Sequence, residues 1–394
     1  MCVSPASRSS KKIVSKKKIL ISKKAAVRKP VEIKKTVQTP MGEMADLVPT
    51  RPKLEPVMPV EKHGQLVLAA TPAFTDFDLP TDNKLLFSSQ HAAAFFQPTF
   101  SGRVISAMFG YVRDPGAKGY KRFHEGIDIR PMERDDDGEP VDDVRCAASG
   151  VVRYVCGDAD GSNYGKYIVV EHSLFGAKVY TLYAHLASVQ DGLEAGDEVD
   201  KGQRLGRMGR TSSEFEIDPE RAHLHFEVDL MLNRHYIAWS EKCGDGEPKH
   251  GLYNGANLLG IDPVRFLLFL QRHPGAELGD YTATERVAFR ALVPRREFSW
   301  LREYPFSLKK PITENTSALE VAMTYYGLPV SITPRSRKEL TSSQSQALAN
   351  GSFPVTYASE KELSENGCCK LMVQDGGSWS LSEKGASHLR QLIF

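Results

Sequence analysis

Two histidines and a glutamate alternate with apolar residues in the stretch 222–228, which reads Ala-His-Leu-His-Phe-Glu-Val. In an extended strand, successive side chains point to opposite faces, so His223, His225 and Glu227 share one face. The two imidazoles then lie about 6–7 Å apart along the strand. One of them can bind a metal while the other reaches the ligand or substrate beside it. Because the motif is short, a surface pair on an amphipathic strand is the alternative.

A second pair of candidate ligands lies upstream, where His124 and Asp128 are separated by three residues. Gly126, between them, gives the backbone freedom to bend. Imidazole nitrogen and carboxylate oxygen are both good zinc ligands. Two ligands from this stretch and one from the His-x-His strand would leave the fourth tetrahedral position open for water. An open position distinguishes catalytic from structural zinc.

A further histidine, His185, ends the alternating stretch 178–185. Histidine titrates closest to neutral pH, so His185 is a candidate for acid/base chemistry beside the metal. The alternative is a partly buried imidazole that is hydrogen-bonded to a backbone carbonyl.

The segments that must position these residues are short runs separated by Gly, Asp and Asn. Alternating or apolar runs cover residues 150–155, 167–172 and 178–185. Their spacing of roughly 10–12 residues favours antiparallel strands in a compact β domain over a parallel α/β sheet.

The chain has 394 residues, with 41% hydrophobic and 25% charged residues, which is typical of a soluble globular protein. Its net charge of +2 conceals an asymmetry, because residues 1–35 carry 12 Lys and Arg against the single acid Glu32. We predict a disordered basic tail over residues 1–60 and a loosely structured lead-in over 61–100, with the folded body beginning near Gly102. A solvated linker explains the tail better than adhesion to an anionic surface, since no aromatic residues interleave its lysines.

The six cysteines form no Cys-x-x-Cys pair, which argues against a zinc knuckle or a thioredoxin-like motif. We expect buried free thiols, although one disulfide in an oxidising compartment would also fit. The sequence contains no apolar run of the roughly 18 residues that a spanning helix needs, and no convincing secretory signal.

In order and spacing, these residues resemble the lysostaphin-type (LytM-like) zinc metallopeptidases, a family of peptidoglycan endopeptidases. The similarity covers about residues 100–265. It includes residues 106–110, which resemble the family's entry strand, and residues 165–172, which resemble its central strand. Residues 196–206 resemble the hairpin before the last ligand, and Asp262-Pro263 resembles the closing Asp-Pro pair.

The resemblance implies that His124, Asp128 and His225 bind Zn²⁺ and that His185 and His223 are the catalytic histidines. It leaves open which histidine accepts the proton of the attacking water. The implied substrates are peptidoglycan stem peptides or cross-bridges, with the cleaved bond undetermined, and the implied location is the cell envelope, either periplasmic or secreted. The alternative is a non-hydrolytic wall-binding or regulatory protein on the same scaffold. We expect no specific nucleic-acid partner.

The chain departs from the family pattern in two places. Residues 210–221 form a longer and more charged loop before the last ligand, which should line the cleft and alter the substrate subsites. Residues 131–140 form an acidic insert whose spacing does not match an EF-hand, so we expect a solvated turn there.

The composition changes after Leu270. In residues 271–394 we predict a helix at 316–323, a hairpin at 371–381 and a helix at 382–392. This order weakly resembles a winged helix, but the segment lacks a basic recognition stripe, so a packing or substrate-positioning role is preferred. The whole chain is predicted to be mainly β (α+β overall). A compact antiparallel β metallopeptidase domain at 101–270 is followed by a smaller mixed α/β accessory domain at 271–394.

Overall fold

The computed structural model of this chain describes residues 61–62, 65–66, 76–88, 90–113, 122–243, 245–365 and 369–394. The predicted tail at residues 1–60 lies outside these ranges. Short strands at β1 (Glu61–Lys62) and β2 (Gln65–Leu66) precede the main body. No helix in the described part of the chain is long and apolar enough to cross a membrane.

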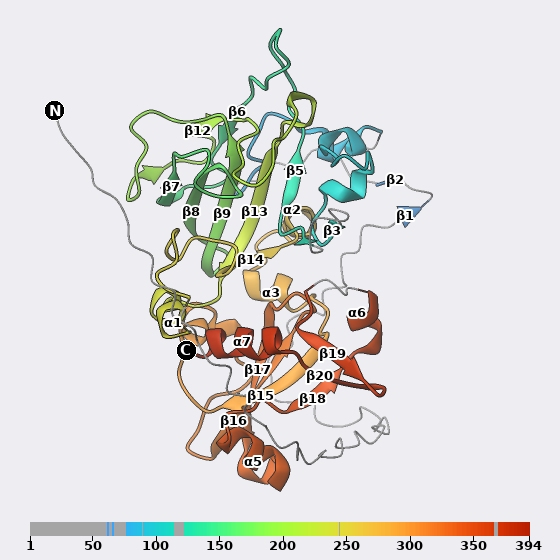
Figure 1. Cartoon of the computed structure of the whole chain (residues 1–394), viewed down its shortest axis with the longest axis vertical. Coiled ribbons are helices and arrows are strands. Elements are labelled where there is room, and N and C mark those ends of the chain that lie inside the picture. The colour runs from blue at the N-terminus through green and yellow to red at the C-terminus, as the bar shows by residue number, and fades with distance from the viewer. Residues whose placement is uncertain are drawn as a thin grey trace, which may run out of the picture. The chain divides into compact units, whose positions relative to one another are not determined.

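A seven-stranded antiparallel sheet forms the centre of the predicted metallopeptidase region (Figure 1). Six of its strands follow the order β11-β7-β8-β9-β13-β14, and β5 pairs with β13 beside this path. The runs at 150–155, 167–172 and 178–185 are confirmed as the strands β7, β8 and β9. The strands are β5 (Ile127–Ile129), β7 (Gly150–Cys156), β8 (Lys166–Leu174), β9 (Ala177–Leu186), β11 (Glu198–Val199), β13 (Leu224–Met231) and β14 (Leu258–Ile261).

Strand β13 lies between β9 and β14 and is buried over its whole length. Leu224, Phe226 and Val228 enter the main hydrophobic core. The other face of the sheet is covered as well, by a smaller cluster that includes Tyr164 and Tyr167. Polar side chains on that face of β13 are therefore held away from bulk water, where buried polar groups need partners.

A second sheet of three short strands follows the order β10-β12-β6. Its strands are β6 (Asp143–Arg145), β10 (Ser188–Val189) and β12 (Arg204–Arg207). The hairpin expected at 196–206 is therefore wrong, because β11 pairs with β7 while β12 pairs with β6 and β10. The turn at Gly202, whose φ is +81°, directs the chain from one sheet to the other.

The segment before the expected start at Gly102 belongs to the core. Phe77, Phe95 and Phe96 are all fully or almost fully buried there. This segment folds as short 3₁₀ turns, η1 (Leu85–Phe87) and η2 (Ala92–Phe95). Such short turns leave no helical or strand period of apolar residues in the sequence. Another such turn, η3 (Val104–Ala107), stands where the resemblance implied an entry strand. The Ser106 hydroxyl donates to the carbonyl of Arg103, at 2.6 Å, which favours a turn over a strand.

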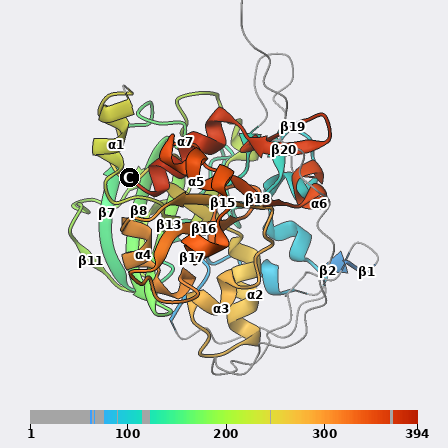
Figure 2. The same cartoon turned by 90° about the horizontal axis from the view of Figure 1, so that it is seen from below.

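The C-terminal part contains a four-stranded antiparallel sheet in the order β17-β16-β15-β18, seen from below in Figure 2. The helix predicted at 316–323 is wrong, because these residues form β16. Leu319, Val321 and Met323 alternate into the core, and Glu320 pairs with Arg335 on the neighbouring strand. The strands are β15 (Phe289–Pro294), β16 (Thr316–Met323), β17 (Pro329–Ser336) and β18 (Val355–Ala358).

The end of the chain follows its prediction. A hairpin of β19 (Met372–Asp375) and β20 (Ser378–Leu381) precedes α7 (Glu383–Leu392), whose N-cap is Ser382. Asp262 caps α2 in the same way. The other helices are α1 (Tyr236–Cys243), α2 (Pro263–Arg272), α3 (Leu278–Thr282), α4 (Ser299–Glu303), α5 (Ser342–Ala349) and α6 (Glu360–Glu365), with 3₁₀ turns η5 (Pro219–Arg221), η6 (Pro305–Ser307) and η7 (Arg337–Glu339).

One hydrophobic cluster runs through both parts of the chain, because it contains Phe226 and Phe266 as well as Trp300 and Leu319. The described residues all belong to one compact unit. Among the cysteines that the structure describes, Cys146 and Cys156 are buried free thiols, as expected, Cys369 is buried and Cys243 is exposed.

His172, on β8, gives a testable pH dependence of stability. One ring nitrogen lies 3.1 Å from the Ser149 carbonyl and the other 2.7 Å from the Thr181 hydroxyl. Burial lowers the pKa of His172 from 6.5 to about 4. The unfolded chain therefore binds a proton that the folded chain rejects, and the free energy of unfolding should fall as pH drops from about 6.5 to about 4, by roughly 3 kcal/mol from this residue.

We expect His172→Asn to flatten that slope, as measured by urea unfolding at pH 7, 5.5 and 4.5. The control His235→Asn, at an exposed position, should retain the wild-type slope. Equal slopes for wild type and His172→Asn would contradict this assignment.

Candidate active site

The three expected metal ligands converge in the structure. Asp128 lies on β5 directly opposite His225 on β13, and His124 comes from the turn that precedes β5. His124 Nε2 lies 3.0 Å from Asp128 Oδ1 and 3.1 Å from His225 Nδ1, and His225 Nδ1 lies 3.1 Å from the same carboxylate oxygen. All three side chains are buried, and one donor atom from each lies within 4.8 Å of the others. They could hold a metal ion.

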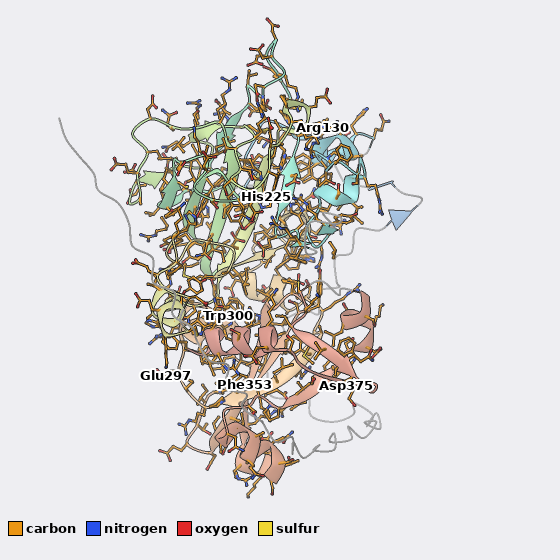
Figure 3. The ribbon with its side chains drawn as sticks, viewed as in Figure 1. Arg130, His225, Glu297, Trp300, Phe353 and Asp375 are labelled. Carbon is orange, nitrogen blue, oxygen red and sulfur yellow. The ribbon has the colours of Figure 1, made fainter. Side chains whose placement is uncertain are left out.

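The two ring nitrogens of His225 have different partners. Nε2 donates to Glu227 Oε1 at 2.6 Å, while Nδ1 faces Asp128 and His124. Glu227 lies two residues further along β13 on the same face of the strand, as the alternation predicted. An acceptor on the outer nitrogen fixes the orientation of a metal-binding imidazole and raises its basicity. Figure 3 shows His225 among the strands of the main sheet.

His124 is oriented in the same manner by backbone. Its Nδ1 lies 2.9 Å from the Met108 carbonyl and donates to it, so Nε2 faces Asp128. The Arg113 guanidinium also reaches this group. It contacts Asp128 Oδ2 and lies 3.0 Å from His124 Nε2. A metal ion held by the three residues would compete with Arg113 for His124 Nε2.

The protonation of the three groups depends on burial and on one another. Burial would raise the pKa of Asp128, but Arg113 and His124 outweigh it and hold that pKa well below its usual range. Burial lowers the pKa of His124 to about 4. Burial would also lower the pKa of His225, but hydrogen bonds to Asp128 and Glu227 raise it to about 9.

The two expected catalytic histidines lie side by side beside this group. His185 is the penultimate residue of β9 and His223 directly precedes β13, with ring centroids 5.0 Å apart. Nδ1 of His185 donates to the Thr211 carbonyl, and Nδ1 of His223 donates to the Arg221 carbonyl, both at 2.7 Å. His185 has a φ of +60°, a conformation that costs energy for a residue other than glycine and that often marks a functional position.

These hydrogen bonds leave Nε2 of each ring free to accept a proton. His223 Nε2 is buried without a hydrogen-bond partner in the described structure and lies 3.5 Å from Asp128 Oδ1. Burial and the neighbouring histidines lower the pKa of His185 well below 6.5, and burial lowers that of His223. Both rings are therefore neutral near pH 7 and can act as proton acceptors.

The polar face of β13 continues past Glu227 to Asp229, which is fully buried. Burial and the charge of Glu227 raise the pKa of Asp229 well above its usual range. The same two causes raise the pKa of Glu125 to about 8. Tyr164 Oη donates to Glu125 Oε2 at 3.4 Å. Two buried carboxyl groups with raised pKa values, those of Asp229 and Glu125, therefore lie near the His225–Glu227 pair.

The site opens into a cavity of about 90 Å³ whose lining includes Arg113, Arg122, His124, His185, Phe215 and His225. A larger cavity of about 660 Å³ is lined mainly by residues 209–217, and Phe215 borders both. The chemistry belongs to the smaller cavity, because that one holds the histidines. The charged loop thus lines the cleft as expected, and its Glu214 forms an ion pair with Arg122.

The donor set of two imidazoles and one carboxylate, with two further imidazoles beside it, fits a catalytic zinc ion. Sequence reasoning placed all five residues but missed their partners. Arg113 has no distinctive spacing, and the Met108, Thr211 and Arg221 carbonyls carry no residue-type signal. Glu227 could have been assigned, since its place on the face of His225 was already visible.

Substitution of Gly165 tests how closely the loop that contains Thr211 must approach the strands around His185. An added Cβ at Gly165 would lie 2.2 Å from the Thr211 carbonyl oxygen, the acceptor for His185, whereas at Gly192 it would meet nothing within 4 Å. Both glycines have positive φ, of +61° and +76°. We expect Gly192→Ala to cost about 1 kcal/mol from backbone strain alone. Gly165→Ala should cost more, as measured by thermal unfolding, and a cost equal to that of Gly192→Ala would contradict the steric role of this glycine.

The sequence profile described as Peptidase family M23 matches residues 122–237. Among solved structures, the chain is similar to a LytM protein from Ruminococcus gnavus, with 24% identity over 38% of this chain and 47% of that chain, at a TM-score of 0.25. It is also similar to the catalytic domain of lysostaphin from Staphylococcus simulans, with 20% identity over 41% of this chain and 88% of that chain, at a TM-score of 0.25. This chain thus spans less than half of the LytM protein's length, and no curated protein matches it. The expected resemblance is confirmed by this match, in which residues 122–237 are similar to Peptidase family M23.

Proposed function

We propose that this protein is a zinc-dependent metalloendopeptidase that hydrolyses peptide cross-links of bacterial peptidoglycan. One observation carries the proposal, namely that a segment matching a peptidase family brings His124, Asp128 and His225 within 4.8 Å of one another. His185 and His223 lie beside them. The proposed ligands are His124, Asp128 and His225, and the proposed catalytic residues are His185 and His223.

A zinc ion held by the three ligands would lower the pKa of a water molecule towards neutrality and polarise the scissile carbonyl. His185 and His223 do the rest of the chemistry with their free Nε2 atoms. One neutral ring accepts the proton of the attacking water at Nε2. A ring that carries a proton at Nε2 can donate a hydrogen bond to the developing oxyanion or protonate the leaving amine. The Thr211 and Arg221 carbonyls keep each ring in the tautomer that has this lone pair.

The proposed substrates are stem peptides or cross-bridges of the wall, so the proposed place of action is the cell envelope. The charged loop 210–221 and its Glu214–Arg122 ion pair border the cleft. We therefore expect substrate subsites that differ from those of relatives with a short Gly/Ser/Thr-rich turn at this point.

The test is mass spectrometry of muropeptides released from purified peptidoglycan by the full chain. We expect cross-linked species to disappear, with new peptide termini that identify the cleaved bond. His225→Ala and chelated protein should release nothing, and the exposed-site control His235→Ala should behave as wild type. No release by zinc-loaded wild type would favour the non-hydrolytic wall-binding alternative.

Glu227 offers a test of zinc binding that does not depend on the substrate. Glu227→Gln retains the shape of the side chain but removes the charge that His225 Nε2 faces at 2.6 Å. Loss of such a partner typically weakens metal binding 10–100-fold. We expect a zinc affinity at least about tenfold lower, measured by competition with a chromophoric chelator, and no change for Glu198→Gln at an exposed site on β11. Unchanged zinc affinity in Glu227→Gln would rule out this role.

A further inference from the structure

We propose that the C-terminal part of the chain positions the zinc ligand His124, through the aromatic turn Tyr325-Tyr326. This turn joins β16 to β17. The inference rests on the proposed function in that it takes zinc to be the metal. It gives residues 289–394, which lie beyond the matched family segment, a part in the active site rather than a separate task.

The aromatic turn packs directly on the residue that precedes His124. The ring of Tyr326 stacks on Phe123 with centroids 5.4 Å apart and an interplanar angle of 16°. Tyr325 meets the same ring edge-on at 5.8 Å. Phe109 completes the group, edge-on to both Phe123 at 5.1 Å and Tyr326 at 5.4 Å. Aromatic pairs in these geometries are attractive beyond the area that they bury.

The two phenylalanines belong to the segments that hold His124. Residues 108–111 make three hydrogen bonds to this histidine. The Met108 carbonyl accepts from Nδ1 at 2.9 Å, the Tyr111 carbonyl accepts from the backbone N–H at 3.0 Å, and the Gly110 N–H donates to the His124 carbonyl at 2.9 Å. A shift of Phe109 would therefore move the acceptor that keeps His124 Nε2 facing Asp128.

The aromatic turn is itself firmly held. A ring nitrogen of His388, on α7, donates to the Gly327 carbonyl at 2.8 Å. An added Cβ at Gly327 would lie 2.6 Å from that ring, and Gly327 has a φ of +100°. Tyr326 Oη donates to Glu285 at 3.3 Å, and Glu285 pairs with Arg265 on α2 at 3.0 Å. The turn thus joins the last helix of the chain to the metal site.

A purely structural role for these rings would be to hold the C-terminal part in place, but other contacts already do so. Tyr304 Oη accepts from the Met231 N–H at 2.9 Å, at the end of β13. Asn233 Nδ2 donates to the Gln391 carbonyl at 2.6 Å, and Arg234 pairs with Glu303 at 3.0 Å. Removing one tyrosine ring from the turn leaves all of these contacts. Its effect on metal binding can therefore be separated from detachment.

The experiment measures zinc affinity in the full-length protein by chelator competition, together with the visible absorption spectrum of the Co²⁺ form, which reports ligand geometry. Tyr326→Leu retains apolar bulk but loses the stacked ring, and we expect its zinc affinity to be about tenfold lower, with an altered Co²⁺ spectrum. Tyr326→Phe keeps the ring and should restore both readouts. Tyr357→Ala, at an exposed aromatic on β18, is the matched control and should match wild type.

Wild-type zinc affinity and an unchanged Co²⁺ spectrum in folded Tyr326→Leu would overturn the inference. So would an equal loss in Tyr357→Ala, which would indicate general destabilisation. If Tyr326→Leu does not fold, Tyr325→Leu provides the same comparison, since its ring also lies on Phe123. Failure to cleave peptidoglycan by a wild type that binds zinc would refute the proposed function, yet leave the affinity comparison valid. An unchanged affinity beside normal cleavage would refute the positioning role alone.

Discussion

The candidate active site depends on the burial of a polar strand face inside a sheet that is covered on both sides. On β13 the apolar residues enter the main core, and the opposite face carries His225, Glu227 and Asp229 under a second cluster of tyrosines. Burying polar groups without partners is costly, which favours the pairing of His225 with Glu227, although neither carboxylate oxygen of Asp229 has a hydrogen-bond partner in the described structure. Glu227 takes one nitrogen of His225 and leaves the other to face Asp128 and His124. Because the two ring nitrogens of His225 have different partners, Nδ1 is directed towards His124 and Asp128.

Hydrogen bonds also orient the other three histidines of the site. His124, His185 and His223 each donate from Nδ1 to a backbone carbonyl of a loop, and the Nε2 atoms of the three rings face the interior of the site. Burial keeps the rings of His185 and His223 neutral by lowering their pKa values. A sheet supplies the rigid side of the site, and loops supply the acceptors that select the tautomers.

The sequence was most informative where residues able to bind a metal lie on a segment with a clear strand pattern. The His-x-His strand, the His124–Asp128 pair and strands β7 to β9 were predictable because side-chain alternation and ligand chemistry are both visible in residue types. The prediction of a helix at 316–323 was wrong because the segment begins like a helix N-cap but also alternates apolar and polar residues. Packing against neighbouring strands, which the sequence does not show, selects the strand. The 3₁₀ turns of residues 85–107 have no period at all. Arg113 and the aromatic turn could not be foreseen, since their roles depend on contacts between segments far apart in the chain.

The folded unit of this protein extends beyond the segment that matches the family. The matched family segment ends at 237, yet its core residues are continuous with Phe266, Trp300 and Leu319 further along the chain. A fragment cut at 270 would end inside α2 and would remove Tyr281 from its contacts with Phe266 and Phe269. The backbone N–H of Met231 would also lose its tyrosine acceptor. Separating the matched segment from the residues that follow it would therefore expose part of a shared interior. The heritable unit of folding here is longer than the unit that sequence similarity recognises.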